Sequence, residues 1–423
     1  MKKLLACLCV ACAQHLAAQD LVITNSRIID GNGGIIARGS VVVRAGRIVS
    51  VSDGVATAPG AREIDAHGMT VMPGFIDSHR HLMQGDPAQW LKEQAPQRMK
   101  EFLDAGFTTI LSAGDPLEPI LELRRRLKEG EIKGPRLLAV GRVPLARNSG
   151  GFRPGVDPAR LDISRPPDRP TKSATAIPRE ETLQTVRALA KAGVDAFKMA
   201  IIVTPDGPEK ETLSMITDEA RRLNIPTITH AVSVQDTIAA VEARTTVLAH
   251  TPHIGQLNES QVRVIAQSGI PMMSTLGVFV PAFAEENERI RARTGVDNMA
   301  RFRDLDPFPW NTLSSAGQGP VNARLLWEAG VTYGYGTDTS FVPRDSLAQE
   351  LRPLRLVFSA KDIVRIMTRN AATVIGRGNE LGTLAPGKLA DIVILDGDPS
   401  TNIYDVLRVK VVIKRGEIVA DHR

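Results

Sequence analysis

Short apolar runs alternate with turn residues at both ends of the chain. They predict strands at Leu21 to Ile29, Gly39 to Val51, Ala390 to Leu395 and Val409 to Ile413. Lys414 to Glu417 resembles the turn of a hairpin. Neither end has enough strands to bury a sheet alone. The pattern therefore predicts one small β-sandwich that is assembled from residues 19–73 and 378–423.

The middle of the chain, residues 74–377, alternates buried-strand runs with helical segments. Eight such runs with helices between most of them predict an α/β fold, a (β/α)8 TIM barrel, whose catalytic groups lie at the carboxyl ends of its strands. The strand candidates are Gly74 to Ser78, Thr108 to Ser112, Arg136 to Val140, Val194 to Met199, Ile225 to Thr229, Thr246 to Ala249, Ile270 to Ser274 and Val331 to Gly336. Helices are expected at Pro119 to Glu129, Glu180 to Ala192, Glu211 to Leu223 and Glu259 to Gln267.

Two connections in this region are unusually long. One runs from residue 144 to 178 and is rich in Pro, Gly and Arg, and the other runs from 281 to 319. Long insertions after barrel strands usually shape access to the substrate.

The first 18 residues have the pattern of a signal peptide. Lys2 and Lys3 precede a short apolar stretch, and Ala17 and Ala18 offer a cleavage site. Cleavage after Ala13 is an alternative. The apolar stretch is too short for a stable membrane span. We therefore expect export to the periplasm or secretion. A lipid anchor at Cys7 is less favoured, because no apolar core precedes it.

The composition excludes several classes of partner and of catalytic group. The chain has 423 residues, of which 43% are hydrophobic and 23% charged, as in a globular protein. The formal charge of +5 includes the two leader lysines, so it does not indicate a nucleic-acid partner. All three cysteines (Cys7, Cys9 and Cys12) lie in the leader. After cleavage no cysteine remains for a disulfide, a nucleophile or a metal ligand.

Polar residues with metal-binding chemistry end five of the predicted strands. They are His79 and His81, Lys198, His230, His250 and Asp338, and they include four of the eight histidines of the chain. His79 and His81 are two positions apart on a strand, so their side chains point to the same side. Alone, such a pair is more often structural than metal-binding. Together with the other strand ends, it predicts a metal site.

Lys198 lies within an apolar strand and has two interpretations. A neutral amine could react with carbon dioxide to form an anionic carbamate that bridges two metal ions. Alternatively, the side chain could reach the barrel mouth with its charge paired. Position alone leaves both open.

Several motifs resemble those of the amidohydrolase superfamily. The first is Pro73 to Leu82, which contains the His-x-His pair, and the second is Leu381 to Asp391 near the C-terminus. Ala105 to Thr109 and Gly134 to Arg136 also fit. The resemblance covers nearly the whole mature chain. It is strongest to the branch that holds imidazolonepropionase-like proteins, Xaa-Pro and Xaa-Arg/Lys dipeptidases and ochratoxinase.

The resemblance implies a two-metal centre. His79 and His81 would bind the more buried ion, His230 and His250 the second, and a carboxylated Lys198 would bridge both. Zinc suits imidazole and carboxylate ligands, with manganese, cobalt and iron as alternatives. A homo-oligomer is also expected by analogy.

The resemblance also assigns Asp338 as the catalytic residue. It would contact the first ion, take a proton from the metal-activated hydroxide as that attacks the amide, and return the proton to the leaving amine. The expected substrate is a dipeptide or an N-acyl or N-aroyl amino acid, such as an ochratoxin-type amide. A cyclic amide, imidazolone or lactone is the second possibility, and a non-catalytic metal-binding scaffold is a third of a different class.

Candidates for substrate contact are less well defined. Arg142, Arg147 and Arg153 could receive a substrate carboxylate, or they could form a solvated basic loop. His253 could orient substrate, although a structural histidine at a helix start is the simpler interpretation. Tyr335 could reach substrate or fill the barrel. The segment 148–152 lacks the histidine that related dipeptidase-like proteins carry there, which weakens the transfer of their substrates.

Overall fold

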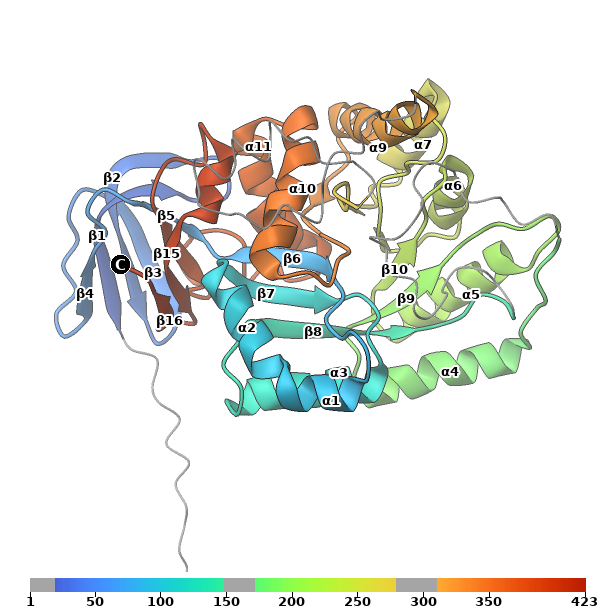
Figure 1. The fold of residues 1–423 in the computed structure, drawn as a ribbon, viewed down its shortest axis with the longest axis horizontal. Helices are drawn as coiled ribbons and strands as arrows, with labels where there is room; N and C mark the ends of the chain where they lie inside the picture. The colour runs from blue at the N-terminus through green and yellow to red at the C-terminus, as the bar shows by residue number, and fades with distance from the viewer. Residues whose placement is uncertain (1–19, 148–171, 279–309) are drawn as a thin grey trace, which may run out of the picture.

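The structure is a computed structural model that describes residues 20–147, 172–278 and 310–423. Figure 1 shows two sheets side by side, one of them surrounded by helices. The predicted leader, Arg153 and most of both long connections lie outside the described residues. No helix in the described ranges is both long and apolar enough to cross a membrane.

The predicted barrel is confirmed. Eight parallel strands follow one another in chain order, and the core strands are buried on both faces because helices cover the outside. The strands are β6 (Phe75–Arg80), β7 (Phe107–Ser112), β8 (Arg136–Arg142), β9 (Ala196–Ala200), β10 (Thr227–His230), β11 (Val247–Leu248), β12 (Met272–Met273) and β13 (Tyr333–Gly334). The last three are shorter than the apolar runs that predicted them.

Backbone hydrogen bonds close the ring between the first and last strands. Ser78 N donates to Tyr335 O over 2.9 Å, and Asp338 N donates to His79 O over 2.8 Å. The segment that continues β13 therefore lies directly beside β6. As a result, the first histidines of the barrel and the last aspartate meet at one seam.

The helices surround the barrel strands and match the predicted segments closely. Gly130 and Gly193 end α3 and α4 in left-handed conformation, which glycine adopts without a Cβ clash. The helices are α1 (Pro87–Glu93), α2 (Ala95–Asp104), α3 (Leu117–Glu129), α4 (Arg179–Ala192), α5 (Glu209–Arg222), α6 (Val234–Glu242), α7 (Glu259–Gln267), α9 (Trp310–Glu328), α10 (Pro343–Val357), α11 (Ala360–Arg365), the π-helical turn η3 (Ile366–Asn370), α12 (Ala371–Val374) and the 3-10 turn η4 (Ile403–Leu407).

The two chain ends form the second sheet, as predicted. Its strands run in the order β16-β15-β14-β5-β1-β2-β3, with β4 also paired to β1. Ile48 N donates to Lys388 O over 2.9 Å, so the far edge folds back and encloses a separate apolar core. The strands are β1 (Leu21–Ile29), β2 (Ile35–Arg44), β3 (Arg47–Asp53), β4 (Arg62–Asp65), β5 (Thr70–Pro73), β14 (Ile392–Leu395), β15 (Val409–Lys414) and β16 (Glu417–Asp421).

One strand prediction was wrong. The run Gly39 to Val51 is a hairpin of two strands, because Ala45 and Gly46 both adopt positive φ (46° and 74°) and reverse the chain. The predicted turn at Lys414 to Glu417 is confirmed by the same geometry, with Arg415 and Gly416 at positive φ between β15 and β16.

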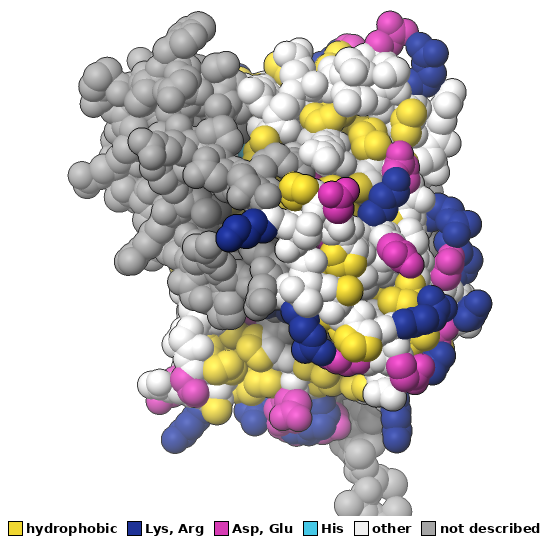
Figure 2. Space-filling view, turned by 90° about the vertical axis from the view of Figure 1, so that its right-hand side faces the viewer, with side chains coloured by type: hydrophobic (Ala, Val, Ile, Leu, Met, Phe, Trp, Pro, Cys, Tyr) yellow, Lys and Arg dark blue, Asp and Glu magenta, His cyan; other side chains and the backbone are white. Residues whose placement is uncertain are grey.

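The second sheet meets the barrel at the amino ends of the barrel strands. Arg136 Nη1 lies 2.7 Å from Asp391 Oδ2, and only 15% and 5% of these side chains are exposed. Lys414 Nζ donates to the Gly134 carbonyl over 2.6 Å. These contacts leave the opposite, carboxyl ends of the strands free for a site. On the face shown in Figure 2, basic and acidic side chains of the described residues are interspersed.

Candidate metal centre

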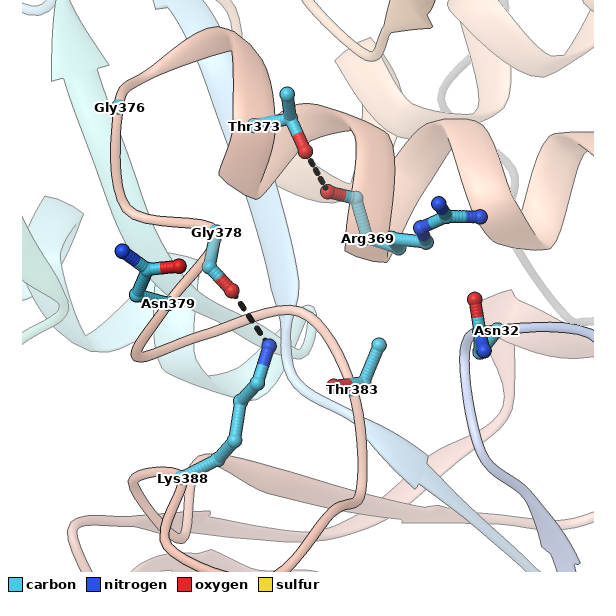
Figure 3. A pocket seen from close by; sticks show the side chains of 8 residues that line it. All are labelled: Asn32, Arg369, Thr373, Gly376, Gly378, Asn379, Thr383 and Lys388. Carbon is cyan, nitrogen blue, oxygen red and sulfur yellow. Dashed lines mark hydrogen bonds between the residues drawn. The ribbon is translucent and has the colours of Figure 1, made fainter.

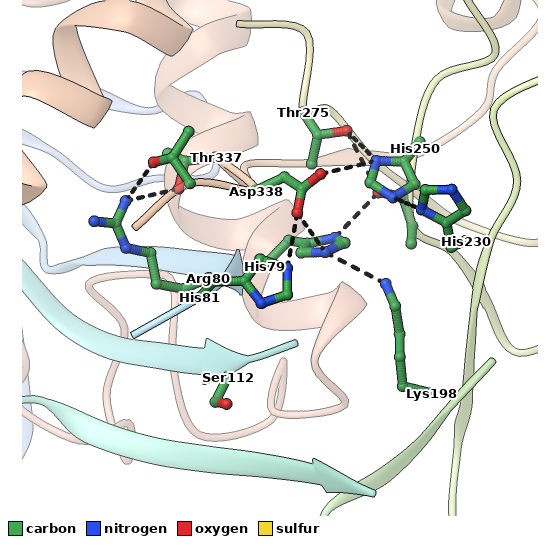
Figure 4. Close-up of polar contacts among 12 residues, drawn as sticks. His79, Arg80, His81, Ser112, Lys198, His230, His250, Thr275, Thr337 and Asp338 are labelled. Atoms are coloured by element: carbon green, nitrogen blue, oxygen red, sulfur yellow. Dashed lines mark hydrogen bonds and ion pairs between the residues drawn. The ribbon is translucent and has the colours of Figure 1, made fainter. Parts of the chain in front are cut away.

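Three side chains meet at the seam of the barrel. His79 and His81 come from the end of β6, and Asp338 follows β13. Asp338 Oδ1 lies 3.2 Å from His79 Nε2 and 3.0 Å from His81 Nε2 (Figure 4). One ligand atom from each lies within 4.8 Å of the others, close enough to share a metal ion. His79 is buried, whereas the His81 side chain is 25% exposed, so the group opens toward solvent on that side.

A second histidine pair lies next to the first. His230 ends β10, and His250 follows β11. His230 Nδ1 is 2.6 Å from His250 Nε2, and the rings of His79 and His250 are 4.8 Å apart. His250 Nδ1 also lies 2.8 Å from Thr275 Oγ1. The structure therefore brings histidines from three strands to one place.

Lys198 projects from β9 into this group and is completely buried. Its Nζ lies 3.3 Å from His79 Nε2. Burial lowers the pKa of Lys198 to about 7, against the opposing effect of Asp338 and with a smaller contribution from the nearby Arg142. A substantial fraction of the amine is therefore neutral at neutral pH.

The imidazoles of His79, His230 and His250 are held in their neutral form. Burial, reinforced by the charge of Lys198, lowers the pKa of His79 to about 4 and of His230 to about 3. Burial and the adjacent His230 bring the pKa of His250 well below its usual value. Burial acts to raise the pKa of Asp338, but His79 and His81 outweigh it and hold that pKa well below its usual value. Neutral imidazoles and an ionised carboxylate are the forms that bind metal ions.

Asp77 connects the segment of His79 to the segment that carries Asp338. Its Oδ1 accepts from the backbone N–H groups of His79 (3.1 Å) and Thr337 (3.2 Å), and its Oδ2 accepts from Thr337 Oγ1 over 2.7 Å. Asp338 itself has a φ of 52°, a left-handed conformation that aspartate tolerates better than most residues. Asp77 is thus the structural acceptor that its place at the strand end suggests.

Arg80 points away from the histidines and into the protein. Its Nη1 donates to Thr337 Oγ1 (3.0 Å) and Thr339 Oγ1 (2.9 Å), and its Nη2 donates to the carbonyl of Phe341. Its guanidinium carbon lies 5.1 Å from the centre of the Phe102 ring. This fully buried arginine therefore holds the segment that carries Asp338.

The candidates for substrate contact have different positions. Arg142 is exposed at the end of β8 and close enough to Lys198 to lower its pKa. His253 is half-buried and interacts electrostatically with Asp338. Arg147 instead pairs with Glu181 in the first turn of α4.

Tyr335 is completely buried, and its ring packs 5.9 Å from that of Phe107. Its place favours the barrel-filling alternative, because the ring is part of the buried apolar core of the barrel. Of the substrate candidates within the described residues, Arg142 interacts electrostatically with Lys198, and His253 with Asp338.

Sequence analysis missed two residues that hold the centre. Thr275 follows the seventh predicted strand, and extending the survey of strand ends to this strand would have found it. Asp115 accepts from Ser112 Oγ over 2.6 Å and from the N–H groups of Leu82 and Met83, so it fixes the loop after β6. No pattern in the sequence marks Asp115, because the loop that it fixes lies more than 30 residues earlier in the chain.

The donor set fits divalent metal ions. Imidazole nitrogens and a carboxylate from four strands converge, as first-row metal sites require, and the amine of Lys198 lies among them. Arg142 and His253 flank the group rather than joining it. This arrangement is typical of hydrolytic metal centres at the mouth of a barrel.

Comparisons with known proteins agree with this geometry. Imidazolonepropionase of Thermoanaerobacter pseudethanolicus is 23% identical over 84% of this chain and 83% of that protein. The solved structure of a Xaa-Pro dipeptidase with bound methionine covers 95% of this chain and 99% of its own, with a TM-score of 0.71 and 20% identity. That of A. niger ochratoxinase covers 95% of both chains, with a TM-score of 0.69 and 19% identity. At these identities the two structures support the fold alone.

A family model settles the class. The model of the amidohydrolase family matches residues 70–419, which include the barrel and most of the C-terminal strands. The match, the barrel and the histidine-rich centre all agree with the family resemblance of the motifs. The chain therefore belongs to the amidohydrolase family and is a hydrolytic enzyme that acts on carbon–nitrogen bonds.

Proposed function

We propose that this enzyme is a metal-dependent amidohydrolase that cleaves the amide bond of a dipeptide or of an N-acyl or N-aroyl amino acid. The observation that carries the proposal is the convergence of four imidazoles, one ionised carboxylate and one buried amine at the barrel mouth. No structural role requires so many titratable groups in contact, because burying them costs free energy.

Each side chain has a role in the proposed reaction. His79, His81, His230 and His250 would hold two divalent ions, with zinc as the favoured metal. When bound, such ions lower the pKa of a water molecule and polarise the scissile carbonyl. Asp338 would accept the proton of the attacking water and pass it to the leaving nitrogen.

Lys198 would act as a carbamate. Its lowered pKa provides the neutral amine that reacts with carbon dioxide, and the product is an anion in place of a buried cation. The test is NMR of protein prepared with 13C-labelled bicarbonate, in which a carbamate carbon signal should be present and should disappear in Lys198→Ala. Short carboxylic acids should partly restore the activity of that variant, whereas they should not rescue Asp338→Asn.

The substrate class rests on two supports. The solved structures that share this fold include proteins named Xaa-Pro dipeptidase and ochratoxinase, and a dipeptidase by name cleaves a dipeptide. Arg142, exposed beside Lys198, is positioned to pair with a substrate carboxylate. Arg142→Gln should therefore raise KM for carboxylate-bearing amides while leaving the KM of uncharged amides unchanged.

A cyclic substrate is the second candidate. The sequence relative named imidazolonepropionase spans nearly the whole mature chain, and the same centre could open an imidazolone, a cyclic amide or a lactone. A panel of dipeptides, N-acyl and N-aroyl amino acids, hydantoin-type cyclic amides and lactones separates the candidates. We expect the linear amides to give the highest kcat/KM, and a strong preference for the cyclic substrates would reverse the assignment.

We also propose that the enzyme is exported and forms a homo-oligomer. The basic and apolar pattern of residues 1–18 supports removal of a signal peptide, with the mature enzyme outside the cytoplasm. N-terminal sequencing of the exported protein should begin near Gln19. Light scattering of the purified enzyme should give a mass above that of one chain.

A further inference from the structure

A hollow of about 460 Å³ lies where the second sheet meets the segment after the last barrel helices (Figure 3). Asn32 lines it from the turn between β1 and β2, and Arg369 and Thr373 line it from η3 and α12. Thr383 and Lys388 come from the loop that leads to β14. No residue of the histidine group lines this hollow, so it is distinct from the candidate metal centre.

The lining is cationic. Among the described residues, Arg369 and Lys388 carry its only ionised side chains, and no carboxylate lines it. Within the same part of the chain, Arg369 forms no ion pair. Both side chains line the same hollow, and burial and the charge of Arg369 lower the pKa of Lys388. Two like charges that face one hollow repel each other unless an anion lies between them.

The carboxylates of the neighbourhood are already engaged. Asp30 Oδ1 accepts from the backbone N–H groups of Asn32 (2.7 Å) and Gly34 (2.9 Å) within its own turn. Glu380 pairs with Arg377 over 3.2 Å. Neither side chain therefore neutralises the hollow.

Another arginine approaches from the same helix, with its charge paired. Arg365 lies one turn before Arg369, and its Nη1 is 3.5 Å from Asp362 Oδ1. Its Nη2 would be 2.5 Å from a Cβ at Gly33, so its guanidinium covers the β1–β2 turn. The helix takes the wider π-helical form over Ile366–Asn370, which includes Arg369. Such irregular turns cost stability and are frequent at functional sites.

We propose that this hollow binds a small oxyanion of the phosphate type. Arg369 would present its planar fork, which matches an oxyanion, and the hydroxyl of Thr383 and the amide of Asn32 would donate from either side. Lys388 already donates to the carbonyls of Gly378 and Leu381, which leaves one of its three N–H groups for the ligand. A ligand held this way connects the β1–β2 turn to the barrel side and stabilises their contact.

The test is calorimetric titration of the full-length, metal-loaded enzyme with inorganic phosphate, beside thermal unfolding in phosphate and in chloride of equal ionic strength. We expect one saturable site and an unfolding temperature that rises by at least about 2 °C in excess phosphate but not in chloride. Arg369→Gln should weaken phosphate binding by about tenfold or more, because a hydrogen bond to a charged group is lost.

Matched variants distinguish binding in this hollow from binding elsewhere on the enzyme. Arg369→Lys, which keeps the charge without the fork, should bind with intermediate affinity, and circular dichroism checks that both variants fold. Arg221 is an exposed arginine on α5, and the Arg221→Gln variant should bind phosphate as the unchanged enzyme does.

Phosphate can also bind metal ions, so His250→Asn is tested as well and should retain the phosphate site. Loss of binding in His250→Asn with retention in Arg369→Gln would place phosphate at the metal centre and overturn the proposal. An equal response to chloride would overturn it too.

Discussion

The two ends of the barrel bury charge in contrasting ways. At the amino ends of the strands, Arg136 pairs with Asp391, and Lys414 donates to a backbone carbonyl. At the carboxyl ends, the Nζ of Lys198 lies against an imidazole, and histidines contact one another. The first arrangement satisfies each charge locally. The arrangement at the carboxyl ends instead brings several nitrogen donors close to one another.

The contrast separates stability from reactivity. Compensated pairs at the junction with the second sheet can hold two parts together without any ligand. The mouth instead has several titratable side chains in direct contact and an Asp338 in left-handed conformation, which the surrounding hydrogen bonds of Asp77 and Arg80 hold in place. Variants at the mouth should therefore lose activity, whereas variants at the junction should lose stability.

The largest expected effect is on activity at the mouth. Asp338→Asn should lower kcat by about 10³-fold, because the general base is lost. Chelation should likewise abolish hydrolysis, and added zinc should restore it. Steady-state kinetics on the best amide of the panel measure both effects. Activity of Asp338→Asn near that of the unchanged enzyme would contradict the mechanism.

The junction should show the opposite behaviour. Asp391→Asn removes the charge that pairs with Arg136 and leaves one side-chain oxygen where Arg136 and the Arg415 N–H now use two, so we expect the free energy of unfolding to fall by about 3 kcal/mol. The kcat of the folded enzyme should be unchanged. Urea unfolding and kinetics test the two parts, and the exposed pair variant Glu259→Gln should change stability by less than about 0.5 kcal/mol. A large loss of kcat in Asp391→Asn would show that the junction also affects activity and would contradict the contrast between the two ends of the barrel.

Replacement of Arg80 tests whether one residue at the barrel mouth contributes to both stability and activity. Arg80→Met leaves the hydrogen-bond acceptors of the Thr337 to Phe341 segment unsatisfied, so we expect a loss of about 2–3 kcal/mol of stability. We also expect a fall in kcat of about tenfold, because Asp338 loses its fixed position. The matched control is the exposed Arg263→Met. Unchanged kcat would show that Asp77 alone positions the aspartate.

The smallest effect concerns pH. Burial lowers the pKa of Lys414 to about 8, so between pH 8 and 10.5 the unfolded chain binds more protons than the native state. Stability contributed by this group should therefore rise with pH across that window, by at most about 1 kcal/mol per pH unit, and be constant below it. Urea unfolding at several pH values measures the slope. Lys414→Met should flatten it, and the same slope in both proteins would exclude Lys414 as the cause.

Much of the architecture could be predicted from the sequence, because local patterns encode it. Apolar runs identified all eight barrel strands, and the residues that end them identified the histidines, Lys198 and Asp338. Their proximity follows from the rule that carboxyl ends of parallel strands share one face. Their roles as ligands stay predictions that the proposed experiments test.

What the sequence could not reveal depends on long-range contacts. Arg80 looks like a solvated residue between two histidines, yet its partner Thr337 lies 257 positions away. The hairpin within Gly39 to Val51 was missed because Ala45 is not a typical turn residue, and only its positive φ exposes the reversal. For Arg147 the sequence left a carboxylate receptor and a solvated loop residue open, and only the structure shows its ion pair with Glu181 of α4.

Closure of the barrel has a consequence for synthesis of the enzyme. The first histidines and the last aspartate meet only when the segment after β13 forms backbone hydrogen bonds to β6. A nascent chain that has not yet emerged past Asp338 cannot assemble this trio, however long its earlier strands have been outside the ribosome. Assembly of the trio therefore requires that nearly the whole barrel has been synthesised.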